Sequence, residues 1–166
     1  LSETGAGSFL GSVSVSQDIG IFGQGAGLTS ITGDGTQPVI EVSNATVTLS
    51  SLTLEDNDFS SSSGRGGCLS AENSEMTLDD VHISNCHAGE YGGGLYFLET
   101  NSWISNSIIE GSSAERGGGA LFLNSNGGTD AYEHIIQHSI VRDNTATQTG
   151  GGIDNYDSHV SVRNSI

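Results

Sequence analysis

The sequence predicts an all-β protein, a right-handed parallel β-helix of about five to six coils with three short strands per coil. Three observations predict it: glycine triplets recur along the chain, short segments with alternating apolar residues lie between them, and these segments align in columns. No window has the i, i+3, i+4, i+7 apolar spacing of an amphipathic helix. A short repeated unit cannot bury its own apolar side, so neighbouring units stack and share one core.

Each predicted coil begins with glycines that precede an apolar strand. Glycine triplets start at Gly92, Gly117 and Gly150, and Gly66-Gly67 is a degenerate earlier copy. Glycine at a corner adopts backbone conformations that other residues resist. Aligned on the triplets, the strands that follow form four columns: Leu69/Leu95/Ala120/Ile153, Ser70/Tyr96/Leu121/Asp154, Ala71/Phe97/Phe122/Asn155 and Glu72/Leu98/Leu123/Tyr156.

The segments between the glycines supply the other strands and the corners. Their apolar column is Leu49, Leu78, Ile104, Ile136 and Val162. A polar column predicts a corner between two strands, because short polar side chains bond to the local backbone there; it is Ser51, Asp80, Asn106, His138 and Asn164. A column of small residues precedes the next glycines: Ala88, Ala114 and Ala146.

The length of 166 residues predicts a single domain over residues 1–166. Residues 1–30 are expected to form irregular first coils or an N-terminal cap, and residues 31–166 the repeat coils. The chain stops at Ile166 within the third strand of a coil. An uncovered coil would expose its core, so we expect a fragment of a longer protein or a partner that covers this end.

The charge balance excludes several classes of partner. Acidic residues number 20 against 4 basic ones, all of them Arg, and the formal net charge is -16. Nucleic-acid binding and docking on anionic membranes both need clustered Lys or Arg, so no nucleic acid is expected. No apolar run approaches the roughly 18 residues of a membrane span.

The Gly-Gly-Gly-apolar pattern, strands such as Thr77-Leu78, the polar corner and the alanine before the next glycines resemble secreted right-handed β-helix repeat proteins. The most similar are the polymorphic outer-membrane-protein type repeats of surface adhesins and autotransporter passengers. The resemblance covers about residues 31–166, most strongly 66–166, although the Phe-x-x-Asn motif of the chlamydial members is missing. It implies an extracellular or cell-surface location and a non-enzymatic structural or adhesive role.

The strand after each glycine group carries the candidate binding surface. Alternation turns the first and third columns inward, so Phe97 and Phe122 are expected to stack in the core. The outward apolar stripe is then Tyr96, Leu98, Leu121, Leu123 and Tyr156. An exposed stripe suggests contact with a protein or glycan, or with neighbouring coils or subunits of a larger assembly. Alternatively, the segment at 126–133 folds over the stripe and covers it.

A polysaccharide lyase or hydrolase of the pectate-lyase-like β-helix type, or the non-catalytic coils of one, is the alternative function. Such enzymes need carboxylates that converge on one bond. Asp79-Asp80 is the best pair, but strand alternation sends the two side chains to different sides. No catalytic residue is therefore predicted, and corner roles are favoured for both.

Other candidate sites remain open alternatives. Asp56 and Asp58 could bind Ca²⁺ or form a solvated acidic turn, and no cofactor is predicted. Cys68 and Cys86 fall in one coil and are either a disulfide in an oxidising compartment or two buried thiols. Asn44 begins a glycosylation sequon, which has meaning only in a secreted eukaryotic protein.

Overall fold

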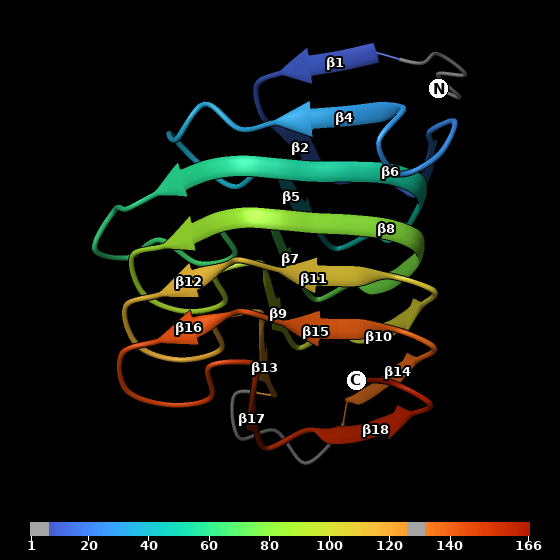
Figure 1. The fold of residues 1–166 in the computed structure, drawn as a ribbon. Helices are drawn as coiled ribbons and strands as arrows, with labels where there is room; N and C mark the ends of the chain where they lie inside the picture. The colour runs from blue at the N-terminus through green and yellow to red at the C-terminus, as the bar shows by residue number, and fades with distance from the viewer. Residues whose placement is uncertain (1–6, 126–131) are drawn as a thin grey trace.

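The computed structural model of the chain describes residues 7–125 and 132–166, and these form strands and turns wound into a stack of coils (Figure 1). Every strand pairing is parallel, and strands such as β8, β9 and β10 pair with a strand of the coil before and a strand of the coil after. The prediction of a parallel β-helix is therefore confirmed. Within the described ranges there is no helix long and apolar enough to cross a membrane.

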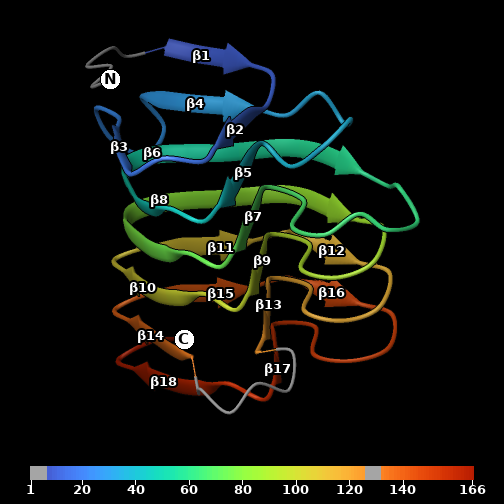
Figure 2. The ribbon, with the colours of Figure 1, turned by 180° about the vertical axis from the view of Figure 1, so that it is seen from behind.

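One side of the stack is a sheet of six strands, one from each coil, which lie in a row in the view from behind (Figure 2). These strands are β2 (Val13–Val15), β5 (Ile40–Ser43), β7 (Leu69–Glu72), β9 (Leu95–Leu98), β13 (Leu121–Asn124) and β17 (Ile153–Tyr156). We call this the six-stranded sheet. Four of these strands, β7, β9, β13 and β17, follow directly after the glycine groups that predict the start of a coil.

The remaining sides form one 12-stranded sheet. Its strands are β1 (Gly7–Leu10), β3 (Ile19–Phe22), β4 (Thr29–Thr32), β6 (Thr46–Phe59), β8 (Glu75–Ala88), β10 (Asn101–Ser105), β11 (Ile108–Glu110), β12 (Ser113–Ala114), β14 (Glu133–Gln137), β15 (Ile140–Arg142), β16 (Thr145–Ala146) and β18 (His159–Arg163). In the two middle coils, β6 and β8 each continue through two corners as 14-residue strands. In the coils after them the same path is divided into three strands, β10 to β12 and β14 to β16.

The corners between strands are built from residues with positive φ. The polar column that predicted a corner has this backbone throughout, with φ between 48° and 56°: Ser51, Asp80, Asn106, His138 and Asn164. Two further corners are mostly Asn and Asp, which tolerate left-handed backbone better than other side chains: Asn44/Asn73/Glu99/Asp157 and Asp56/Asn85/Gly111/Asp143. The corner prediction is confirmed, and its residue types follow from the backbone conformation.

The residue after a corner links one coil to the next, a feature absent from the sequence-based prediction. Ser107 Oγ donates to Ser105 O in its own coil and accepts from Val81 N, 26 residues earlier. The same arrangement recurs at Ser139, whose hydroxyl accepts from Ser107 N. At a corner, backbone N–H and C=O groups lose their partners in the sheet, and a buried unpaired N–H is costly. The serine hydroxyls supply these groups with hydrogen bonds.

The interior is filled by the apolar side chains that alternate inward along the strands. The predicted apolar column lies there, and Leu49, Leu78, Ile104 and Ile136 are fully buried. Val162 continues the column in β18 and is 53% exposed, because β18 pairs with β14 on one side and with no other described strand. The column of Ala88, Ala114 and Ala146 is likewise in register.

The predicted register of β13 is wrong by one residue. Leu121 pairs with Leu95 and with Ile153, and Phe122 pairs with Tyr96. The left-handed glycines that repeat are Gly66, Gly92, Gly118 and Gly150, so the triplet of the third copy begins one residue before the true corner. Since side chains alternate, a shift of one residue moves each β13 side chain to the other face.

The extra glycine, Gly117, has its own structural reason. It lies in register with Tyr91 and Thr149, and a Cβ on Gly117 would meet Asp154 Oδ2 at 2.2 Å. The Asp154 side chain fills this space and accepts a hydrogen bond from Thr149 Oγ1. Gly117 is therefore required for close packing against Asp154, whereas Gly118 is the corner glycine. Alignment on the start of the triplet places Gly117 at the corner and so gives the wrong register.

Candidate functional site

The predicted contact stripe is divided by the corrected register. Leu121 and Leu123 face the interior and are fully buried, so the expectation that they point outward is wrong. Tyr96, Leu98 and Tyr156 are on the outer side of the six-stranded sheet, and Tyr156 is 60% exposed. Tyr96 is nevertheless only 1% exposed, so it offers no open surface. A binding role for Leu98 and Tyr156 stays a prediction.

Arg65, from the segment before β7, and Phe122, from β13, cover Tyr96. The guanidinium of Arg65 lies 5.5 Å from the Tyr96 ring centroid, and the Tyr96 ring stacks on Phe122 with centroids 5.6 Å apart. The Tyr91 ring, from the turn before β9, lies 4.4 Å from the Phe122 ring between centroids and is tilted by 36°. Phe122 therefore belongs to this outer layer, and the predicted stacking of Phe97 with Phe122 in the core is wrong.

Glu90 joins the charged part of this layer. Its Oε2 accepts from Arg65 Nε at 2.7 Å, and its Oε1 is 3.0 Å from Arg116 Nη1. Arg116 in turn lies over the Tyr91 ring at 5.7 Å. We call these residues the arginine–aromatic cluster: Arg65, Glu90, Tyr91, Tyr96, Arg116 and Phe122. Burial raises the pKa of Tyr96, so its hydroxyl stays protonated at neutral pH.

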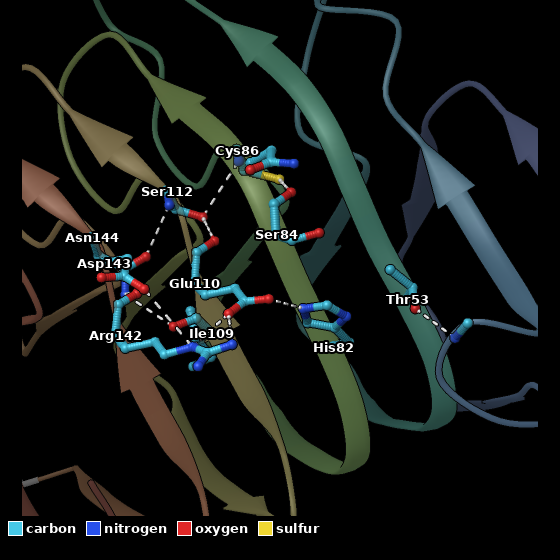
Figure 3. Close-up of polar contacts among 12 residues, drawn as sticks. Thr53, His82, Ser84, Cys86, Ile109, Glu110, Ser112, Arg142, Asp143 and Asn144 are labelled. Carbon is cyan, nitrogen blue, oxygen red and sulfur yellow. Dashed lines mark hydrogen bonds and ion pairs between the residues drawn. The ribbon is translucent and has the colours of Figure 1, made fainter.

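The 12-stranded sheet carries a second charged network (Figure 3). Glu110 Oε1 lies 2.9 Å from His82 Nε2, while Glu110 Oε2 accepts from Arg142 Nε at 2.7 Å and pairs with Arg142 Nη2 at 2.6 Å. The hydrogen bonds from Arg142 and His82 lower the pKa of Glu110, so it is ionised at neutral pH. The network borders a shallow hollow of about 270 Å³.

The candidate catalytic carboxylates do not form a converging pair. Asp79 Oδ1 accepts from Ser105 Oγ at 2.7 Å and from Asn106 Nδ2 at 2.8 Å, and these bonds lower the Asp79 pKa. Asp80 is a left-handed corner residue with an exposed side chain. A general acid needs a raised pKa, so the state of Asp79 fits a structural carboxylate.

The calcium candidates lie at and beside another corner. Asp56 has φ of 52°, and its Oδ1 accepts from Asn85 Nδ2 at 3.2 Å. Asp58 is exposed and in register with His87. Over residues 7–125 and 132–166, no three His, Cys, Asp or Glu side chains gather in a group that could hold a metal ion. The structure therefore supplies only two candidate ligands, and calcium binding stays untested.

Cys68 and Cys86 form a disulfide, which resolves the alternatives that the sequence left open. Their Cα atoms are 5.6 Å apart and both residues are buried. The bridge joins the residue before β7 to the last segment of β8, after the corner at Asn85, so it fixes the two sheets of one coil to each other. Asn44 of the sequon is an exposed left-handed corner residue.

His134 is a buried residue whose role the sequence did not indicate. It faces the interior from β14, where Nδ1 lies 2.8 Å from Ser102 Oγ and the ring stacks on Phe97 with centroids 6.2 Å apart. Burial lowers the pKa of His134 to about 4, so the ring is neutral at pH 7. The sequence signal for its burial is the spacing of two residues from Ile136, because alternate residues of a strand point to the same side.

Comparison with known proteins yields one match. No protein-family model matches the chain, and no solved structure matches it. An immunoglobulin A1 protease of Streptococcus sanguinis is 34% identical over 76 residues, which is 45% of this chain and 4% of the length of that protein. The matched length is close to three of the 26-residue coils. The likeness to polymorphic outer-membrane-protein type repeats therefore stays a prediction.

Proposed function

We propose that the chain is a non-catalytic, rod-like module of a secreted or cell-surface protein that presents a binding surface to protein or glycan partners. The observation that carries the proposal is the arrangement of Glu90 and Glu110. Each carboxylate lies between a basic side chain from the coil before and one from the coil after it, with both oxygens engaged. Charged groups paired in this way hold coils together and leave little freedom for proton transfer to a substrate.

Two observations support the location. The Cys68–Cys86 disulfide is typical of proteins in oxidising compartments. The streptococcal relative is named for an immunoglobulin, and immunoglobulins are extracellular proteins. Since the match covers a small part of that protein, its protease activity is not carried over to this chain.

A carbohydrate-active enzyme is the competing function, and the structure lends it less support. Hydrolysis or elimination on a polysaccharide needs an acid and a base that converge on one bond. Asp79 is held by Ser105 and Asn106, and the neighbouring Asp80 is a corner residue. A net charge of -16 also repels polyuronates.

The test is a paired screen of the purified chain. Immobilised glycans and proteins measure binding, and neutral and acidic polysaccharides in solution measure the release of reducing ends or unsaturated products. We expect binding without turnover. Turnover that is lost in Asp79→Asn would overturn the proposal in favour of the enzyme.

A further inference from the structure

The chain's only tryptophan is open to solvent on the side of the molecule formed by β8, β10 and β14. Trp103 lies on β10 and is 47% exposed, with Thr77 and Ile135 as its register neighbours. Tryptophan is highly buried on average. An amphipathic ring left open on a sheet face therefore marks a contact surface.

Two carboxylates lie beside this tryptophan. Asn101 lies two residues before Trp103, on the same face of β10. It is in register with Glu75 of β8. On the other side, Asn101 Oδ1 accepts a hydrogen bond from Glu133 N of β14 at 2.9 Å. Strand spacing of about 4.8 Å and a residue repeat of about 7 Å place both glutamates near the ring. Both glutamates are exposed, and neither carboxylate has an ion pair with any residue that the structure describes.

These residues border connected hollows. One, of about 180 Å³, is lined by Glu75, Thr77, Asn101, Trp103 and Glu133. A larger one of about 420 Å³ shares Glu75 and Asn101 with it and adds the carboxylates of Asp18 and Glu99. No Lys or Arg of the described chain lines either hollow. The negative charge of this surface is therefore complementary to a cationic ligand.

We infer that this surface, the Trp103 groove (Glu75, Asn101, Trp103 and Glu133), binds a lysine- or arginine-bearing segment of a partner protein. The cation lies against the indole and between the two glutamates, and its apolar stem packs along the ring. A neutral glycan would leave both carboxylates without a partner, and an acidic glycan would be repelled. The inference rests on the proposed binding role of the module and names the chemistry of the partner.

The test uses the full chain and a synthetic peptide of alternating lysine and glycine. Because Trp103 is the only tryptophan, its fluorescence emission reports on the groove alone. We expect a saturable change in emission with the lysine peptide, weakened as salt screens the charges, and no change with the same peptide acetylated on every lysine.

Variants separate the groove from the general acidity of the chain. Calorimetry should show about fivefold weaker peptide binding for Trp103→Thr, which matches Thr77 in the neighbouring strand. Glu75→Gln with Glu133→Gln should weaken binding about tenfold. The matched control, Glu41→Gln with Asp58→Asn, removes two exposed charges elsewhere and should change affinity less than about twofold.

Failure of this inference is distinguishable from failure of the proposed function. Absence of peptide binding, or equal weakening in the groove and control variants, overturns the inference. Binding of neutral glycans that is lost in Trp103→Thr, without peptide binding, overturns the cationic partner and leaves the adhesive module standing. Polysaccharide turnover overturns the proposed function itself.

Discussion

Tyr96 on the six-stranded sheet and Trp103 on the 12-stranded sheet both point away from the core, yet they have opposite surroundings. Tyr96 is covered by the Arg65 guanidinium and by Phe122, and is 1% exposed. Trp103 has a polar groove beside it and is 47% exposed. The difference teaches that strand alternation decides which way a side chain points, whereas the side chains of neighbouring coils decide whether it is exposed to solvent.

The two faces also differ in how their charges are used. Glu90, in the arginine–aromatic cluster, lies beneath two arginines with its side chain 12% exposed. Glu75 and Glu133, in the Trp103 groove, are exposed and have no described ion pair. The first arrangement stabilises the rod, and the second leaves charge available for a partner.

The largest expected effect tests the corrected register on the six-stranded sheet. Leu121→Ala should lower the free energy of unfolding by about 3–4 kcal/mol, because it leaves a cavity in the core. Leu98→Ala, on the outer face, should cost about 1 kcal/mol or less. Guanidinium unfolding of both variants measures the difference. Equal losses would contradict the pairing of Leu121 with Leu95.

A similar loss is expected from removal of the covered aromatic residue. Tyr96→Ala should cost about 3 kcal/mol, since it empties the space beneath Arg65 and beside Phe122. Trp103→Thr should change stability by about 0.5 kcal/mol or less. A thermal melt of each variant measures this, and comparable destabilisation by both would show that Trp103 is also covered.

A buried histidine between the two sheets makes the free energy of unfolding depend on pH. His134 contacts Ser102 of one sheet and Phe97 of the other, and burial lowers its pKa to about 4. The unfolded chain therefore binds more protons than the folded chain between pH about 6.5 and about 4. The free energy of unfolding should fall by up to about 3 kcal/mol as the pH is lowered through this range.

The control for His134 is a variant that cannot titrate. His134→Gln should flatten the pH dependence between about 6.5 and 4.5, measured by guanidinium unfolding at several pH values. Asp79 and Glu110 also have lowered pKa values, but their stabilisation is lost only at lower pH, as the pH falls through the carboxylate range. A slope unchanged by the substitution would contradict the buried neutral histidine.

The smallest effects compare the two bridging glutamates. Glu90→Gln should cost about 1–2 kcal/mol, because it leaves Arg65 and Arg116 without an ion-pair partner over the Tyr96 and Tyr91 rings, while both arginines keep partial access to water. Glu110→Gln should cost about 0.5 kcal/mol or less, since its partner Arg142 is well exposed. Chemical unfolding at low salt measures both, and the reverse order would contradict the role given to the arginine–aromatic cluster.

Local patterns predicted most of the fold. The corner residues Ser51, Asp80 and Asn106 were identifiable because left-handed backbone and side-chain bonding to the nearby main chain are properties of a few adjacent residues. The inward column was identifiable because alternation has a strict period of two. The candidate site was less predictable, because alignment on the glycine triplet places Leu121 on the wrong face and no repeat in the sequence marks Trp103 as exposed.

The sequence by itself determined the parallel β-helix, its corner columns and its acidic character, because each depends on periodicity, local backbone preference or composition. Tertiary structure alone decided between disulfide and thiols at Cys68 and Cys86, chose Gly118 over Gly117 as the corner, and covered Tyr96 while leaving Trp103 open. These outcomes depend on contacts across one coil or between neighbouring coils, where packing outweighs the preference of any single segment.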